Sequence, residues 1–302
     1  MKIKLSEQLG KLLAKAVSED VGRALAEDLG TFDPEADLTA HLVARKQKAQ
    51  AVIITREDAV LCGTLWANEA CRLIDKTLEI HWSGEDGKPI FKNQPFCLIK
   101  GNARSIHIVE RTMLNFLQIL SATTTLTRCY VDRIRHLPVK IFDTRKTIPG
   151  LRIAQKYAVA CGGGSNHRLG LYDAMLIKEN HMRGYDLQTM IRRADMIKNH
   201  RPEIPLIIEV ENLQQLSLAL GSQADRVLLD NFSLVDMALA VTMNQRKKQQ
   251  EPDAKVKLLE VSGNITLDNI LLVATTGIDC ISVGALTKHV QAVDMSCLFV
   301  EE

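Results

Sequence analysis

The second half of this 302-residue chain alternates short apolar runs with segments of helical periodicity, and this feature limits its fold most strongly. The apolar runs, which we expect to be strands, span residues 139–145, 174–180, 205–212, 226–232, 257–264 and 280–286. Segments such as 186–199 and 234–248 between them show helical spacing. Strand and helix in alternation predict parallel βαβ units. Because the runs are apolar throughout, the strands should be buried on both faces, as in an α/β barrel or a doubly wound sheet.

The first half has a different pattern, which indicates a separate α+β region. A helix is predicted over residues 5–27, and a second helix around 65–75. Strand-like runs of the region cover residues 49–55, 78–83 and 95–101.

A long helix is predicted over residues 103–120, followed by a further helix that ends near residue 138. One side of the long helix is apolar, with Ile106, Val109, Met113, Phe116, Leu117 and Leu120. The opposite side carries His107, Arg111, Asn115 and Gln118. By its residues alone, this polar side is a solvated surface.

The predicted strands of the second half end in charged or small polar residues. In order these are Arg145 with Lys146, Lys178, Glu209, Asp230, Ser262 with Asn264, and Gly284. One such residue is usually only the first solvated position of a loop. A barrel, however, directs all of its strand ends into one mouth, where active sites lie. Three cations with two carboxylates favour an anionic substrate together with a divalent metal or sugar hydroxyls.

A glycine-rich segment, 162–164, lies between the first two strand ends and is followed by His167 and Arg168. Glycines let backbone amides approach a ligand closely. The segment matches neither the dinucleotide pattern Gly-x-Gly-x-x-Gly nor the P-loop, so we exclude both kinds of site. The arginines suit carboxylate recognition, and Glu209 with Asp230 suit Mg²⁺ or ribose hydroxyls. A transfer that joins a carboxylated acceptor to a phosphorylated sugar, with loss of pyrophosphate, would use both sets.

Bulk composition gives no reason to expect a nucleic-acid or membrane partner. The formal net charge is only +2, and no apolar run approaches the roughly 20 residues that span a bilayer. The seven cysteines never form Cys-x-x-Cys, which argues against a disulfide framework and a zinc site. The N-terminal stretch 1–17 lacks the features of a secretory signal, so we expect a cytoplasmic protein.

Several motifs, in order along nearly the whole chain, resemble the quinolinate phosphoribosyltransferase family. They are "EDLG", "DLTA", "ERTMLNFLQ", "DTRKTIPGLR", "KYAVACGGGSNHRLGLYDAMLIKENH", "IEVEN", "LLDNF", "VSGNI" and "ISVGALTKHV". The stretch from Asp143 to His181 is the most specific. One departure is Ala122, where relatives commonly have glycine, and it affects no expected catalytic residue.

The resemblance implies an α/β fold of two domains. An N-terminal α+β open sandwich would comprise residues 1–119 with 289–302, and an incomplete, seven-stranded TIM-like α/β barrel would comprise 120–288. It also implies a homodimer whose active sites are shared between subunits, with Arg111 reaching the site of the other subunit.

The resemblance further implies roles for the strand-end residues. Arg145, Lys146, His167 and Arg168 would form the quinolinate pocket. Lys178 would lie between the two substrates, and Glu209 and Asp230 would serve the ribose and Mg²⁺. Ser262, Gly263, Asn264 and Gly284 would bind the phosphate end of 5-phosphoribosyl 1-pyrophosphate. Thr144 and Val283 complete the expected substrate-binding set, in which Lys146, Lys178, Glu209 and Asp230 are the catalytic residues.

The implied reaction transfers a phosphoribosyl group to quinolinate and releases CO₂, in the de novo route to NAD. Three alternatives remain at this stage. A related transferase could use nicotinate or another pyridine carboxylate. A Schiff-base aldolase would use a strand-end lysine such as Lys178. A non-enzymatic sensor of pyridine dicarboxylates would have little use for Glu209 and Asp230.

Overall fold

The computed structural model describes residues 3, 5–31, 33–251 and 256–300. The chain forms two compact units, each described by itself below. The first unit comprises Met1–Arg128, Lys146–Gly163 and Ala285–Glu302, and the second comprises Cys129–Arg145 and Gly164–Gly284. The domain bounds expected from the sequence stay a prediction. Positions 1, 2, 4, 32, 301 and 302 of the expected first domain lie outside the described residues.

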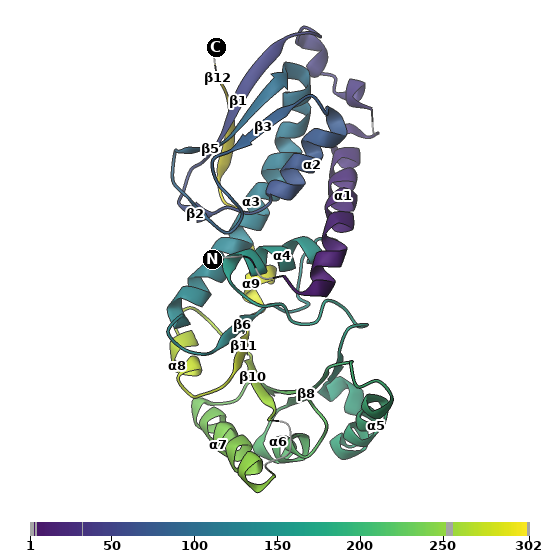
Figure 1. Cartoon of the computed structure of the whole chain (residues 1–302), viewed down its shortest axis with the longest axis vertical. Coiled ribbons are helices and arrows are strands. Elements are labelled where there is room, and N and C mark those ends of the chain that lie inside the picture. The colour runs from purple at the N-terminus through teal and green to yellow at the C-terminus, as the bar shows by residue number, and fades with distance from the viewer. Residues whose placement is uncertain (1–2, 4, 32, 252–255, 301–302) are drawn as a thin grey trace. The chain divides into compact units, whose positions relative to one another are not determined.

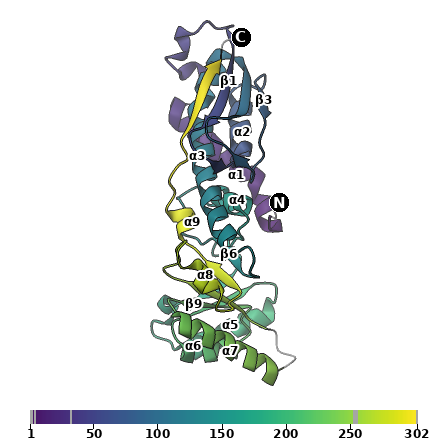
Figure 2. The ribbon, with the colours of Figure 1, turned by 90° about the vertical axis from the view of Figure 1, so that its left-hand side faces the viewer.

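The first unit contains a four-stranded antiparallel sheet in the order β12-β1-β5-β3. Its strands are β12 (Met295–Val300), β1 (Lys48–Thr55), β5 (Pro95–Asn102) and β3 (Glu79–Trp82). The last strand of the chain therefore lies beside the first, with Gln50 opposite Val300, as the yellow and indigo arrows in Figures 1 and 2 show. A second, two-stranded sheet pairs β2 (Ala59–Val60) with β4 (Pro89–Ile90).

The helices of the first unit pack against this sheet and against one another around a single core. The core is lined by α1 (Glu7–Leu29), α2 (Thr64–Ile74), α4 (Arg152–Gly162) and the first part of α3 (Ala103–Ile134). The unit also contains α9 (Ala285–Lys288) and the short η1 (Pro34–Ala36) and η2 (Ala40–Leu42). Trp66 is fully buried at the centre of the core, stacked on Phe116 and tilted against Tyr157. Its indole N–H donates to Asp20 Oδ2 of α1 at 3.2 Å, so the buried ring leaves no polar atom unpaired.

Helix α3 is a correction to the sequence prediction. It runs without a break from Ala103 to Ile134, whereas two helices were expected. No proline or glycine lies in this segment, so no helix-breaking residue stops the helix. The two predicted sides of the helix are confirmed: all six apolar residues are buried, while His107, Arg111 and Asn115 are exposed.

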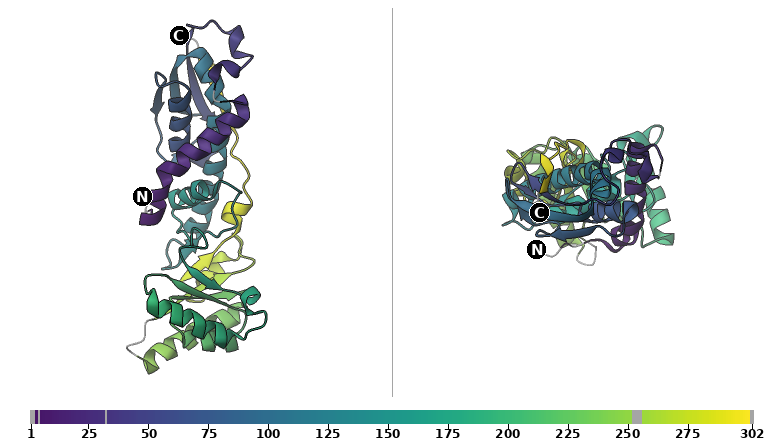
Figure 3. Two further views of the ribbon diagram at one scale, coloured as in Figure 1. Left: turned by 90° about the vertical axis from the view of Figure 1, so that its right-hand side faces the viewer. Right: turned by 90° about the horizontal axis from the view of Figure 1, so that it is seen from above.

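The second unit is built on a six-stranded parallel sheet in the order β6-β11-β10-β9-β8-β7. The strands are β6 (Lys140–Phe142), β11 (Cys280–Ser282), β10 (Leu258–Ser262), β9 (Arg226–Asp230), β8 (Leu206–Val210) and β7 (Met175–Ile177). Each lies inside one of the six predicted runs. The helices of the unit are α5 (Leu187–His200), α6 (Leu213–Leu220), α7 (Leu234–Gln250), α8 (Ile270–Ala274) and η3 (Glu179–Met182). Figure 3 shows the green helices α5, α6 and α7 together on one side of the sheet.

The predicted fold class, an α+β unit with an α/β unit, is confirmed. The sheet of the described residues has six strands and does not close into a barrel, where the resemblance implies seven. The seventh position is reduced to one parallel bridge between Phe142 and Ser165. The bridge is held by hydrogen bonds from Ser165 N to Ile141 O (2.7 Å) and from Asp143 N to Ser165 O (3.1 Å). It places residues 166–168 directly beside the end of β6.

Candidate active site

The carboxyl ends of the parallel strands bring the predicted residues of the second unit to one edge of the sheet. Asp230, the last residue of β9, lies opposite Ser262, the last residue of β10. Glu209 lies near the end of the next strand, β8, and Lys178 directly follows β7. Residues spread over more than 80 positions of sequence therefore meet because parallel strands end together.

Lys178 and Glu209 form an ion pair across β7 and β8, with Nζ 2.5 Å from Oε2. Glu209 is buried, whereas Lys178 is partly exposed. Burial raises the pKa of Glu209, the bond and charge of Lys178 lower it, and the charge of Asp230 raises it again. The two carboxylates are thus close enough to repel each other, and a cation between or beside them would be stabilised.

The loops after β9 and β10 are joined to each other. Asp230 accepts hydrogen bonds from Ser262 Oγ at 2.7 Å and from Asn231 Nδ2 at 3.0 Å. Gly263 has a φ of 98°, and a Cβ at this position would lie 2.1 Å from Asn231 Oδ1. Asn264, with a φ of 52°, donates to Asn231 Oδ1 at 3.3 Å. Only glycine can occupy position 263 without displacing its neighbour.

The end of β11 carries the last two predicted residues. Val283 is buried, and its N–H donates to Phe142 O at 2.9 Å, so this amide is engaged within the sheet. Gly284, the next residue, is partly exposed. Of the two, Gly284 is therefore the one whose backbone borders solvent.

Two arginines make the β6 end of the site cationic. Arg168 donates from Nη1 to Ala174 O at 3.0 Å. Burial and, next, the charge of Arg145 lower the pKa of Arg168. The two guanidinium groups therefore lie within electrostatic reach of each other, and an anion between them would relieve their repulsion. Thr144 and Arg145, which follow β6 in the chain, are half-buried.

Two buried carboxylates of the second unit were missed by the sequence prediction. Asp143 is fully buried and accepts from His167 N at 2.8 Å and Asn166 Nδ2 at 2.6 Å. Glu260, in the middle of β10, is also fully buried and accepts from Arg226 Nη1 at 2.7 Å. The available signal was a charged residue inside an apolar run, because such a charge must find a partner when the strand is buried.

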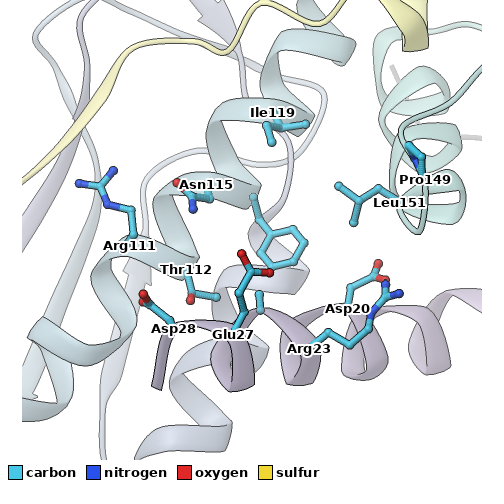
Figure 4. A pocket seen from close by; sticks show the side chains of 12 residues that line it. Asp20, Arg23, Glu27, Asp28, Arg111, Thr112, Asn115, Ile119, Pro149 and Leu151 are labelled. Carbon is cyan, nitrogen blue, oxygen red and sulfur yellow. The ribbon is translucent and has the colours of Figure 1, made fainter. Parts of the chain in front are cut away.

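Two predicted residues belong to the first unit. Lys146 is exposed, and its carbonyl accepts from Thr287 Oγ1 at 2.8 Å. Arg111 is exposed on α3 and lines a cleft of about 490 Å³ between α1 and α3. Figure 4 shows Asn115 beside it and the carboxylates of Glu27 and Asp28 across the cleft on α1. Arg111 thus stands on an open surface of its own unit.

Another cluster in the first unit brings together Cys62, Asp86 and Cys161, whose candidate ligand atoms all lie within 4.8 Å of one another. Asp86 accepts from Thr64 N at 3.2 Å and from Tyr157 Oη at 2.8 Å, so both of its oxygens are engaged. Burial, together with a hydrogen bond to Cys161, raises the pKa of the Cys62 thiol. The buried Cys62 thiol and the fully engaged Asp86 carboxylate account for this cluster.

In the part of the chain that the structure describes, no helix is both long enough and apolar enough to cross a membrane.

An α+β unit and an α/β unit whose strand ends carry opposed cationic and acidic groups define a class of two-domain enzymes with the active site at the strand ends.

Comparison with known proteins identifies the family within this class. The N-terminal domain of quinolinate phosphoribosyl transferase matches residues 37–121, and the C-terminal domain of the same family matches residues 123–297. The chain belongs to the quinolinate phosphoribosyltransferase family, and it is accordingly a transferase.

Individual relatives agree with this assignment. The carboxylating nicotinate-nucleotide pyrophosphorylase of Mycobacterium leprae is 37% identical over 288 residues, which cover 93% of this chain and 96% of the relative. The structure of the nicotinate-nucleotide pyrophosphorylase from Francisella tularensis is similar with a TM-score of 0.87 and 43% identity, over 98% of this chain and 100% of that chain. The structure of the nicotinate-nucleotide pyrophosphorylase from Ehrlichia chaffeensis is similar with a TM-score of 0.84 and 32% identity, over 94% of this chain and 98% of that chain.

Proposed function

We propose that this protein transfers the phosphoribosyl group of 5-phosphoribosyl 1-pyrophosphate to quinolinate, with decarboxylation. The products are nicotinate mononucleotide, pyrophosphate and CO₂, as in de novo NAD biosynthesis. The observation that carries the proposal is that Arg145 and Arg168 lie at the same sheet edge as Glu209 and Asp230. One set suits a dicarboxylate acceptor, and the other suits a ribose with its pyrophosphate.

The acceptor would be bound by its two carboxylates. Arg145, Arg168 and Lys146 supply the cations, and guanidinium groups bind carboxylates through two parallel hydrogen bonds. Holding the pyridine ring in this way directs its nitrogen at the sugar carbon, so much of the rate enhancement comes from positioning. The ring nitrogen lone pair forms the new C–N bond while the bond to pyrophosphate breaks.

Departure of pyrophosphate requires stabilisation of its negative charge. Lys178, which is paired with Glu209 in this structure, can supply an ammonium group. The oxygen donors of Glu209 and Asp230 fit a hard divalent cation, because two mutually repelling carboxylates gain most from one. Mg²⁺ held by these two residues, directly or through water, would offset charge on the pyrophosphate.

Decarboxylation would follow the transfer. Once the ring nitrogen is alkylated it bears a positive charge, and this charge stabilises the electron pair that is left on the adjacent ring carbon when its carboxylate departs as CO₂. The ring carbon then takes up a proton. No covalent enzyme intermediate is required.

We further propose that the protein is a cytoplasmic homodimer in which Arg111 completes the site of the other subunit. Support comes from the position of Arg111, exposed at a cleft of about 490 Å³ on the surface of its own unit. At this open cleft, the guanidinium of Arg111 can serve an acceptor carboxylate only if another surface meets it there.

The test is turnover by the purified protein with quinolinate, 5-phosphoribosyl 1-pyrophosphate and Mg²⁺, followed as release of pyrophosphate and of CO₂ from carboxyl-labelled quinolinate. Nicotinate and a ketose with borohydride are the comparison arms. Faster turnover of nicotinate would contradict the acceptor assignment, and trapping of the ketose on Lys178 would indicate an aldolase. Tight binding of quinolinate without turnover would indicate a sensor.

A further inference from the structure

A buried hydrogen-bond network connects the middle of β10 to the segment at 165–168. Glu260 has no solvent exposure, and its Oε2 accepts from Arg226 Nη1 at 2.7 Å. Its Oε1 accepts from Ser282 Oγ and lies 3.4 Å from His167 Nε2. Burial opposes ionisation, but the hydrogen bond from His167, the charge of Arg226 and the hydrogen bond from Ser282 outweigh it and lower the pKa of Glu260. The carboxylate is therefore ionised and well partnered.

The ring of His167 has a defined tautomer in this network. Its Nδ1 accepts a hydrogen bond from the backbone N–H of Arg168 at 2.8 Å. Because an amide nitrogen only donates, Nδ1 carries no proton here. Nε2 therefore carries the proton and directs it at Glu260 Oε1. Both ring nitrogens of this buried residue are engaged with protein groups.

The backbone of the same residue is fixed independently. His167 N donates to Asp143 Oδ1 at 2.8 Å, and the ring lies edge-on to Phe142 with centroids 6.4 Å apart. The guanidinium of Arg226, the other partner of Glu260, lies over this same ring, 4.5 Å from the Phe142 centroid. Glu260 therefore contacts the His167 ring directly, and through Arg226 it also holds a group that packs on Phe142, the aromatic neighbour of His167.

We propose that Glu260 is a positioning residue of the acceptor pocket, which acts through the His167 tautomer on the backbone of Arg168. This inference rests on the proposed function, in which Arg168 binds a carboxylate of quinolinate. Among the residues of the proposed acceptor pocket, Glu260 contacts His167, through the ring Nε2. Without the negative charge of Glu260, the tautomer of His167 that carries its proton on Nδ1 becomes accessible. In that tautomer Nδ1–H and the backbone N–H of Arg168 are two donors that face each other. The Arg168 main chain would then shift, and small displacements of a binding group weaken catalysis strongly.

The first test is Glu260→Gln, which keeps the shape of the side chain and removes its charge. We expect KM for quinolinate to rise on the order of tenfold, with KM for the sugar pyrophosphate nearly unchanged. Nitrogen NMR of ¹⁵N-histidine-labelled protein should show His167 as the Nε2–H tautomer in the wild type and a mixture in the variant. The control is Glu203→Gln, an exposed carboxylate paired with Arg201 at 3.2 Å in the same unit.

A matched pair of variants at His167 gives a second test, in case Glu260→Gln folds poorly. An asparagine oxygen can replace Nδ1 as the acceptor for Arg168 N–H, whereas a glutamine nitrogen replaces Nε2 as a donor. We expect His167→Asn to keep more activity with quinolinate than His167→Gln.

Three results would overturn the inference. They are an unchanged KM for quinolinate in a folded Glu260→Gln protein, an unchanged His167 tautomer in that variant, and a His167→Gln enzyme at least as active as His167→Asn. Absence of turnover by the wild type would instead contradict the proposed function, since the NMR comparison needs no activity.

Discussion

Lys178 Nζ lies 2.5 Å from Glu209 Oε2, so two residues of the proposed sugar pyrophosphate site hold each other. Binding of the sugar pyrophosphate would have to redirect the ammonium group toward the leaving group. Each residue then depends on the other for its position, and their contributions to catalysis should not add.

We expect Lys178→Ala and Glu209→Gln each to lower kcat roughly 100- to 1,000-fold, because each removes a group that stabilises the transition state. The double variant should lose much less than the product of the two effects, as measured by steady-state kinetics. The control is the Lys198–Asp225 pair, at 2.7 Å in the same unit but away from the strand ends. Lys198→Met should lower stability and leave kcat nearly unchanged. A large kcat loss there would mean that any ion pair of this unit matters equally.

Arg145→Ala should cost about 2.7 to 4 kcal/mol of transition-state stabilisation, the range for loss of one charge-stabilising donor. It should also raise the pKa of Arg168, because a neighbouring positive charge is removed. The comparison is kcat/KM for quinolinate against Arg201→Ala, an exposed arginine of the same unit. Retention of full activity by Arg145→Ala would refute the carboxylate pocket.

Mixing Arg111→Ala with Glu209→Ala protein tests the shared site. Random exchange makes half of the dimers heterodimers, and one of the two sites in each would have neither change, so about a quarter of wild-type activity should return. The control mixture combines Lys178→Ala with Glu209→Ala, which lie in the same unit and should restore nothing. Heterodimers verified by mass spectrometry that remain inactive would count against a borrowed Arg111.

Acid should destabilise the protein through Glu260. Its pKa falls from 4.5 to about 2 on folding, so the stabilisation is complete above pH 4.5 and is lost as the pH falls toward 2. Urea unfolding midpoints measured between pH 6 and pH 2.5 should therefore drop more steeply for the wild type than for Glu260→Gln. Parallel curves for the two proteins would show that the carboxylate gains nothing from its partners.

Gly263→Ala should impair binding of the sugar pyrophosphate, because its Cβ would meet Asn231 Oδ1 at 2.1 Å and its φ is 98°. Gly184→Ala is the matched control: its φ is 87°, but nothing lies within 4 Å of the added Cβ. Both changes share the backbone strain, whereas only the first displaces the loop. A similar KM for the sugar pyrophosphate in the two variants would remove position 263 from the site.

The parallel strands are predictable from the sequence because burial on both faces leaves continuous apolar runs, such as 205–212. Their charged ends follow from the same reasoning. The roles of Asp143 and Glu260 are not predictable in this way, since their partners come from distant segments that only the fold brings together. The single bridge at Ser165 leaves no periodic signal at all, because one residue has no period.

The pairing of Gln50 with Val300 joins positions 250 residues apart, and it has a consequence for biosynthesis. The sheet of the first unit cannot gain its edge strand until β12 has left the ribosome, whereas every strand of the second unit is translated earlier. The second unit can therefore fold while the edge of β1 that will pair with β12 is still unpaired. Such an edge is open to pairing with other nascent chains, so the unfinished first unit is where a chaperone would be needed most.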